Sequence, residues 1–132
     1  MRKLWAALAI IVVVAAGAAC DRDQPQVSTE AGRKLYLDDC ASCHGNDGSG
    51  GRLVGAAVSS DLRAQKLGEA YGFNMALVRR AILDGKNPNG DDLDPAMPRF
   101  RGKLSESDAT NIIVFMQSLR APPATEPPES DH

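Results

Sequence analysis

The chain has 132 residues, which is enough for one globular domain and too few for two. It carries 15 basic and 17 acidic side chains, for a net charge of −2 at pH 7. A protein that binds nucleic acid needs a basic surface, so this balance argues against nucleic acid as a partner.

Residues 1–19 have the layout of a secretory signal peptide. Arg2 and Lys3 form a basic start, the stretch from Leu4 to Ala19 is apolar, and small residues end it. The apolar stretch is shorter than the ~20 residues that a membrane-spanning helix needs. We therefore predict that the signal is cleaved and that the domain is exported. Loss of the two basic residues leaves the mature chain more acidic still.

Cys20 directly follows the apolar stretch. In an oxidising compartment an unpaired cysteine needs a reason. Its position resembles that of the lipid-modified cysteine of bacterial lipoproteins, although Gly17 stands where that family usually has leucine. The resemblance implies a lipid anchor at Cys20, in the bacterial periplasm or on the outer face of the cytoplasmic membrane, with residues 20–27 as a tether. The alternative is ordinary cleavage near Ala19, which leaves a free thiol.

Three segments of the central part have helical signals, and we find no convincing alternation typical of a strand. Each helix is predicted to begin at a capping residue, namely Ser28 (or Thr29), Asn74 and Ser105. Gly85 ends the second helix. Prolines 122 and 123 end the third, whose apolar stripe runs from Ile112 to Leu119. A shorter helix is predicted around residues 62–67.

The remaining segments are predicted to be loops. Residues 45–55 are rich in glycine, and residues 86–102 combine glycine, proline and acidic residues. Residues 122–132 form a predicted disordered, proline-rich tail. The predicted domain therefore covers residues 28–121 and is all-α, small and rich in long loops. Its own core is thin, so we expect a bound group to fill the centre.

The stretch DDCASCHG places Cys40, Cys43 and His44 in one short run. A thioredoxin-like pair belongs near strands, and zinc needs four ligands, whereas a structural disulfide needs no histidine. Covalent haem attachment needs all three residues in this order. Because residues three apart on a helix share a face, both thiols can reach the vinyl groups of one porphyrin, and the histidine follows as an iron ligand. We predict haem, with a disulfide as the main alternative.

Met97 is the candidate for the second axial ligand. It lies between Pro95 and Pro98, in a segment that cannot be helical, and a stiff loop can hold a thioether towards a metal. Met75 and Met116 lie in predicted helices, where methionine is more often core filler. The alternative is that Met97 only fills a gap beneath its loop.

Together these features resemble the class I monohaem cytochrome c family. The segment GRKLYLDDCASCHG is similar to the first helix of that family, and DPAMPRF is similar to the loop that carries its sixth iron ligand. The resemblance implies a small cytochrome c-like fold around one haem c, attached through the two cysteines of the motif. It also implies that Gly32 lets the first helix pack closely on the last, near Phe115, and that Met97 binds the iron.

Two familiar features of that family are missing here. The loop after the motif has no proline, whose carbonyl often holds the proximal histidine, so the acceptor for His44 Nδ1 is not identified. The single tryptophan, Trp5, lies in the signal, so none is available for a haem propionate. Arg99, Arg101 and Lys103 are candidates to neutralise the propionates, and the alternative is that they are solvated surface charges.

The predicted function is electron transfer. A histidine and a methionine fill both axial positions of the haem, and such an iron takes and gives single electrons. We expect a non-enzymatic, membrane-tethered carrier that exchanges electrons with an oxidase, reductase or dehydrogenase complex. Two alternatives remain open. One is a haem-based enzyme or gas sensor whose sixth site opens, and the other is a haem-free thiol–disulfide protein.

Overall fold

The computed structural model describes residues 26–122. The predicted signal peptide, Cys20, nearly all of the tether and the tail from residue 123 lie outside the described residues. Between residues 26 and 122, no helix combines the length and the apolar character that crossing a membrane requires.

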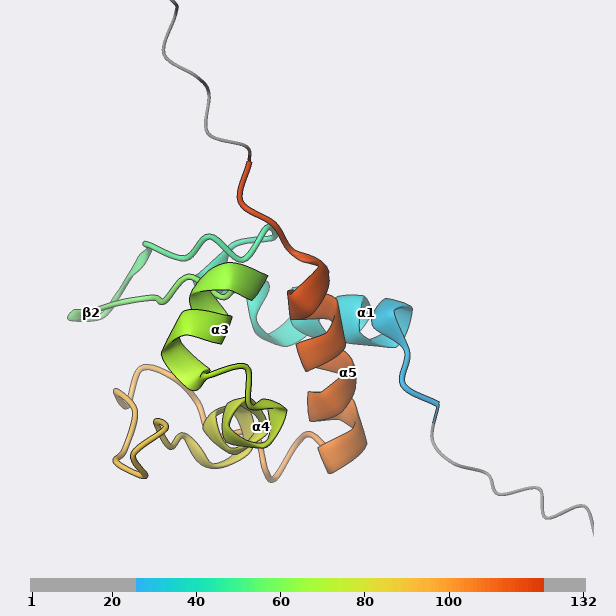
Figure 1. Cartoon of the computed structure of the whole chain (residues 1–132). Helices are drawn as coiled ribbons and strands as arrows, with labels where there is room; N and C mark the ends of the chain where they lie inside the picture. The colour runs from blue at the N-terminus through green and yellow to red at the C-terminus, as the bar shows by residue number, and fades with distance from the viewer. Residues whose placement is uncertain (1–25, 123–132) are drawn as a thin grey trace, which may run out of the picture.

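The described residues form helices joined by long loops (Figure 1). The helices are α1 (Thr29–Asp39), α2 (Ala41–His44), α3 (Ala64–Tyr71), α4 (Met75–Asp84) and α5 (Glu106–Ser118). A short hairpin of β1 (Leu53–Val54) and β2 (Ala57–Val58) lies between α2 and α3. The predicted fold class, a small all-α domain with long loops, is confirmed.

The helix starts follow the predicted caps. The Ser28 side chain accepts from Ala31 N, and Asn74 accepts from two amides at the start of α4. Ser105 and Asp108 form a complete capping box at the start of α5. Gly85 ends α4 at φ +64°, in the left-handed region that glycine tolerates.

Three local features differ from the expectations. Helix α3 begins at Ala64, because Arg63 is still extended, and it continues to Tyr71 rather than ending at residue 67. The segment before His44 is divided into α1 and α2 at Cys40. The strands β1 and β2 pair antiparallel. Each has only two residues, which is too few for the sequence to show an alternation of apolar and polar residues.

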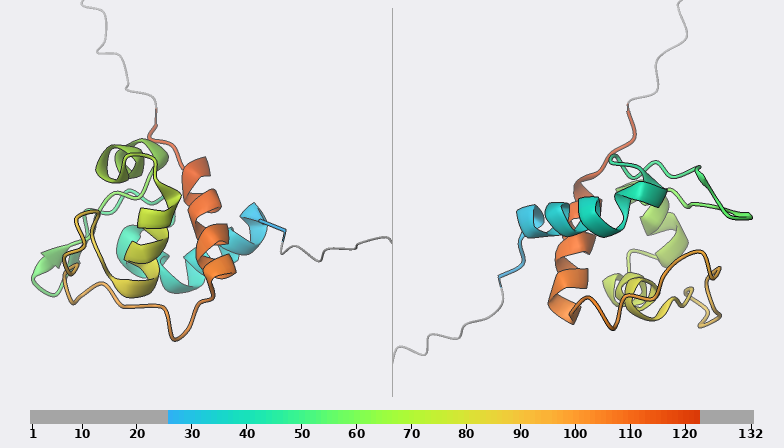
Figure 2. Two further views of the ribbon diagram at one scale, coloured as in Figure 1. Left: turned by 60° about the horizontal axis from the view of Figure 1, so that its bottom comes forward. Right: turned by 180° about the vertical axis from the view of Figure 1, so that it is seen from behind.

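Helices α1 and α5 cross in close contact (Figure 2). A Cβ atom placed on Gly32 would lie 1.9 Å from the Asn111 carbonyl oxygen, so only glycine permits this approach. Beside it, the rings of Tyr36 and Phe115 pack with their centroids 5.2 Å apart. At the start of α1, Ser28 N donates to Asn111 Oδ1 at 2.8 Å. The predicted glycine contact and its neighbouring aromatic are confirmed.

The segment between α4 and α5 runs back along α4. Phe100 N donates to Ile82 O at 3.2 Å, and Arg101 N donates to Leu83 O at 3.0 Å. The rest of this segment, residues 86–98, stands away from the helices on the side of the β-hairpin (Figure 1). Residues of this segment, of α2 and of α4 line a cavity in the core.

Candidate haem-binding site

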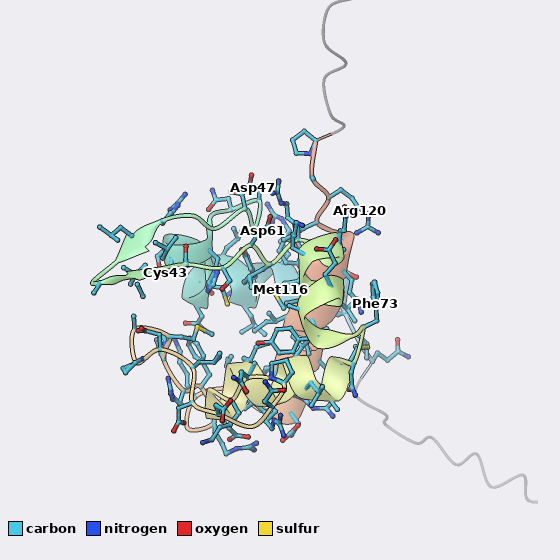
Figure 3. The ribbon with its side chains drawn as sticks, turned by 60° about the vertical axis from the view of Figure 1, so that its left-hand side comes forward. Cys43, Asp47, Asp61, Phe73, Met116 and Arg120 are labelled. Carbon is cyan, nitrogen blue, oxygen red and sulfur yellow. The ribbon has the colours of Figure 1, made fainter. Side chains whose placement is uncertain are left out.

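A cavity of about 420 Å³ lies at the centre of the molecule. This volume falls in the range of roughly 300–1,000 Å³ that is typical of small-molecule and cofactor sites. Its walls are mostly apolar side chains of α4, α5 and the loop that joins them, such as Val78, Ile82, Phe100, Ile112 and Met116. Figure 3 labels Met116 on α5 and Cys43 on α2, which line the cavity from different elements. The thin core expected from the sequence is thus a core with a large hollow.

The attachment motif lies on one tight turn at the edge of this cavity. The Cys40 carbonyl accepts from Cys43 N at 3.2 Å and from His44 N at 2.9 Å. This turn brings all three side chains to the cavity wall. Cys40 and His44 are buried, Cys43 is half-buried, and the two thiols are free rather than joined in a disulfide.

The environment of Cys40 favours the neutral thiol. Burial raises the pKa of the Cys40 thiol to about 12, and the charges of Asp39 and Cys43 add to this rise. A thiol of this kind has almost no thiolate at neutral pH, whereas catalytic cysteines of redox proteins depend on the thiolate.

The imidazole of His44 is held by one backbone carbonyl. Its Nδ1 lies 2.8 Å from Ser60 O. A carbonyl can only accept, so Nδ1 carries the hydrogen and Nε2 keeps its lone pair for a ligand. Among residues 26–122, Nε2 makes no hydrogen bond. Ser60 is therefore the acceptor that the sequence did not identify.

Met97 lies on the loop that closes the cavity and lines it together with His44. Its own backbone is fixed, because Met97 N donates to Asp94 O at 3.0 Å and Arg99 Nη1 donates to Met97 O at 2.6 Å. The half-buried side chain packs against the core. Met116 also lines the cavity, although it is nearly fully buried in α5, as expected of core filler.

The three cations expected near the propionates already have partners among the described residues. Arg101 binds Asp84 and Glu106, and Lys103 binds Asp39. Arg99 donates to three carbonyls of its own loop, including Leu93 O at 2.9 Å.

Arg80, which we did not single out from the sequence, is a different case. Its Nη2 donates to the carbonyls of Asn87 at 2.8 Å and Pro88 at 3.1 Å, and Pro88 lines the cavity. Its buried Nε has no hydrogen-bond partner in the part of the chain that the structure describes. None of the ion pairs within residues 26–122 involves Arg80. A partly buried guanidinium thus lies beside the cavity outside these ion pairs, and the nearby carboxylate of Asp84 is bound to Arg101.

A family model described as "Cytochrome C oxidase, cbb3-type, subunit III" matches residues 27–116, more than half of the chain. The chain belongs to this family of c-type cytochromes. The cytochrome is 28% identical over 98 residues to the cbb3-type cytochrome c oxidase subunit CcoP of Cereibacter sphaeroides, a match that covers 74% of this chain and 30% of that protein. It is 33% identical over 86 residues to cytochrome c6 of a Synechococcus species, with 64% of each chain covered.

A third relative of the cytochrome is an enzyme. It is the thiosulfate dehydrogenase of Stutzerimonas stutzeri, 29% identical over 92 residues, which cover 69% of this chain and 27% of that protein. The cytochrome therefore spans less than a third of the length of the oxidase subunit and of the dehydrogenase.

The cytochrome is of the class I monohaem type, and haem c is its cofactor. The residues around the cavity fit this group. Two free thiols and an imidazole with an available Nε2 lie on one wall, a thioether lies on the closing loop, and the remaining walls are mostly apolar. The unpaired guanidinium of Arg80 suits an anionic group at the edge of the cavity.

Sequence reasoning named the candidate ligands but missed the residues that hold them in place. Ser60 lies 16 residues after His44, so no short motif links the two. Tyr71 and Met116 line the cavity from α3 and α5, and their spacing is also what an ordinary core would show. The glycine run was visible, but its contact with the histidine partner depends on the fold.

Proposed function

We propose that this cytochrome transfers single electrons through one haem c that is attached to Cys40 and Cys43, with His44 and Met97 as axial ligands. The observation that carries the proposal is that the three residues of the attachment motif and the distant Met97 line one mostly apolar cavity. Bound there, the haem supplies an iron that changes between Fe(III) and Fe(II) by one electron.

The chain's own residues attach and orient the group. Cys40 and Cys43 would hold the haem through two thioether bonds, in which each thiol would add its sulfur and its proton across one vinyl group without an oxidant. Ser60 O fixes the His44 ring so that Nε2 is the ligating nitrogen. Met97 would bind the iron from the closing loop, and the mostly apolar walls would limit the access of water.

The domain that does this is proposed to cover residues 28–121 of an exported chain. Removal of residues 1–19, lipidation of Cys20 and a tether of residues 20–27 would hold it at a membrane surface. Eight flexible residues reach only ~15 Å, so its partners are close by. Those partners are proposed to be respiratory or dehydrogenase complexes (an oxidase, reductase or dehydrogenase) that dock weakly around the haem edge.

A second function is supported by one observation. Because thiosulfate dehydrogenases are among the relatives, the domain could serve in an enzyme whose sixth iron position opens to a ligand. The third alternative, a haem-free thiol–disulfide protein, is disfavoured by the burial and high pKa of Cys40.

The test is a visible absorption spectrum of the reduced protein before and after carbon monoxide, for the wild type, Met97→Ala and Met116→Ala. For an electron carrier we expect haem bands that carbon monoxide leaves unchanged in the wild type and in Met116→Ala. Met97→Ala should bind carbon monoxide, because its sixth position is open. A shift in the wild type would favour the enzyme or gas sensor, and a colourless product from cells able to attach haem would favour thiol chemistry.

A further inference from the structure

The glycine-rich loop after the attachment motif packs directly on the carbonyl that holds His44. Gly50 N donates to His44 O at 2.8 Å, and Gly51 N donates to Ser59 O at 2.8 Å. Gly50 thus lies between the turn of the motif and the segment that carries Ser59 and Ser60. It has φ +62°, in the left-handed region.

The contact leaves no room for a side chain at position 50. A Cβ placed on Gly50 would lie 2.3 Å from Ser60 O and 2.7 Å from Ser59 O. Both neighbours are backbone atoms, which cannot rotate away as a side chain can. The carbonyl that would have to move is the one that accepts from His44 Nδ1 at 2.8 Å.

Two neighbouring glycines make it possible to distinguish the effect of this contact from the effect of backbone strain. Gly51 and Gly55 also have positive φ, +73° and +63°. A Cβ on either of them would meet no atom within 4 Å. An alanine at any of the three positions is strained, but only at position 50 does it press on the histidine partner.

We infer that Gly50 is a positioning residue for the proximal histidine: its bare Cα sets how closely Ser60 O approaches His44 Nδ1. The inference rests on the proposed function, in which His44 binds the iron. A close acceptor makes the imidazole a stronger donor, which stabilises Fe(III) and lowers the reduction potential. Moving the acceptor away therefore raises the potential.

The experiment compares Gly50→Ala with Gly51→Ala as haem-loaded proteins. Two quantities are measured: the midpoint potential, and the hydrogen-exchange rate of the His44 ring Nδ1–H by NMR in the reduced, diamagnetic state. We expect a higher potential and faster exchange in Gly50→Ala, and values close to the wild type in Gly51→Ala. If the substitutions only destabilised the fold, both variants would melt at a lower temperature. Their midpoint potentials and their Nδ1–H exchange rates would then not differ from each other.

The outcomes distinguish this inference from the proposed function. If the wild type carries no haem, the proposed function is wrong. If the wild type is a closed-site haem protein and both variants keep its potential and exchange rate, the role of Gly50 is wrong. Should Gly50→Ala fail to fold, Ser60→Gly loosens the same carbonyl without a clash. The same direction of change is then expected, and an unchanged Ser60→Gly variant would overturn the inference.

A second inference comes from an independent observation, the buried Nε of Arg80 that has no hydrogen-bond partner among residues 26–122. The nearby carboxylate of Asp84 is bound to Arg101 instead, and a buried guanidinium nitrogen is compensated best by a hydrogen-bonded carboxylate. Burial raises the pKa of Tyr71, and the charge of Arg80 opposes this rise, so the guanidinium lies near a cavity-lining side chain. We propose that Arg80 binds one haem propionate, again on the basis of the proposed function.

Arg79 provides the matched control for this assignment, because it precedes Arg80 on α4 and is paired with Glu106 at 2.8 Å. Resonance Raman spectra of the haem proteins report the propionate bending mode directly. We expect the band to shift in Arg80→Gln and to stay in place in Arg79→Gln. Equal bands in the wild type and Arg80→Gln would overturn the assignment. If Arg80→Gln does not fold, Arg80→Lys keeps the charge, loses the planar fork and should shift the band in the same way.

Discussion

The crossing of α1 and α5 makes Gly32→Ala the most demanding test of the fold. The new Cβ would lie 1.9 Å from Asn111 O and 2.4 Å from Asn111 C, whereas ordinary contacts begin at 3.4 Å. The two helices must therefore separate by about 1.5 Å at this point. Such a shift disturbs the tilted ring pair of Tyr36 and Phe115 as well as the bond from Ser28 N to Asn111 Oδ1.

The expected loss of stability follows from these contacts. Overpacking a core typically costs about 1–3 kcal/mol, and we expect the upper end because backbone atoms block the new methyl group. For a domain of this size about 1 kcal/mol corresponds to roughly 4–8 °C, so the melting temperature should fall by at least ~12 °C. Thermal unfolding of the haem-loaded protein, followed by far-UV circular dichroism, measures this fall.

Gly102→Ala is the control, since a Cβ there meets nothing within 4 Å. It should change the free energy of unfolding by only ~0.5 kcal/mol or less. If Gly32→Ala is no less stable than Gly102→Ala, the reasoning about the helix crossing is wrong.

Three further predictions concern single polar contacts. Tyr36→Phe removes the 2.8 Å bond from the buried hydroxyl to Gly45 O and should lower the free energy of unfolding by about 1–3 kcal/mol in urea titrations. Ser105→Ala breaks the capping box and should cost about 1 kcal/mol, seen as a lower melting temperature. Hydrogen bonds from Arg63 lower the pKa of Asp61, so its stabilising effect is present above the ordinary carboxyl pKa and is lost as the pH falls through the lowered value. Asp61→Asn should therefore destabilise the protein at pH 7 and much less at pH 2–3, and an equal loss at both pH values would contradict this.

The parts of the fold that were predicted from the sequence depend on local chemistry. Ser28, Asn74 and Ser105 cap their helices with their own side chains, and Gly85 ends α4 through a conformation that glycine adopts easily. Such features are encoded within four residues, so they can be identified without the fold. Gly32 is different, since its contact with α5 followed only from the family resemblance.

The parts that were not predicted depend on contacts between distant segments. Ser60 accepts from His44 through its backbone, and any residue type could offer the same carbonyl. Arg79 and Arg80 are adjacent and differ only in their surroundings. The sequence therefore does not show which of the two binds a carboxylate. The hairpin at residues 53–58 is too short for periodicity to indicate it.

The crossing of the first and last helices also determines where further chain can be attached. The start of α1 and the end of α5 lie away from the loop of residues 86–98 that borders the cavity (Figures 1 and 2). Segments added at either end therefore begin away from this loop, while a deletion that enters α1 or α5 removes half of the central interface. Such a domain can be joined to other domains by gene fusion. The oxidase subunit of Cereibacter sphaeroides, of which this chain matches 30%, is long enough to hold additional domains of this kind.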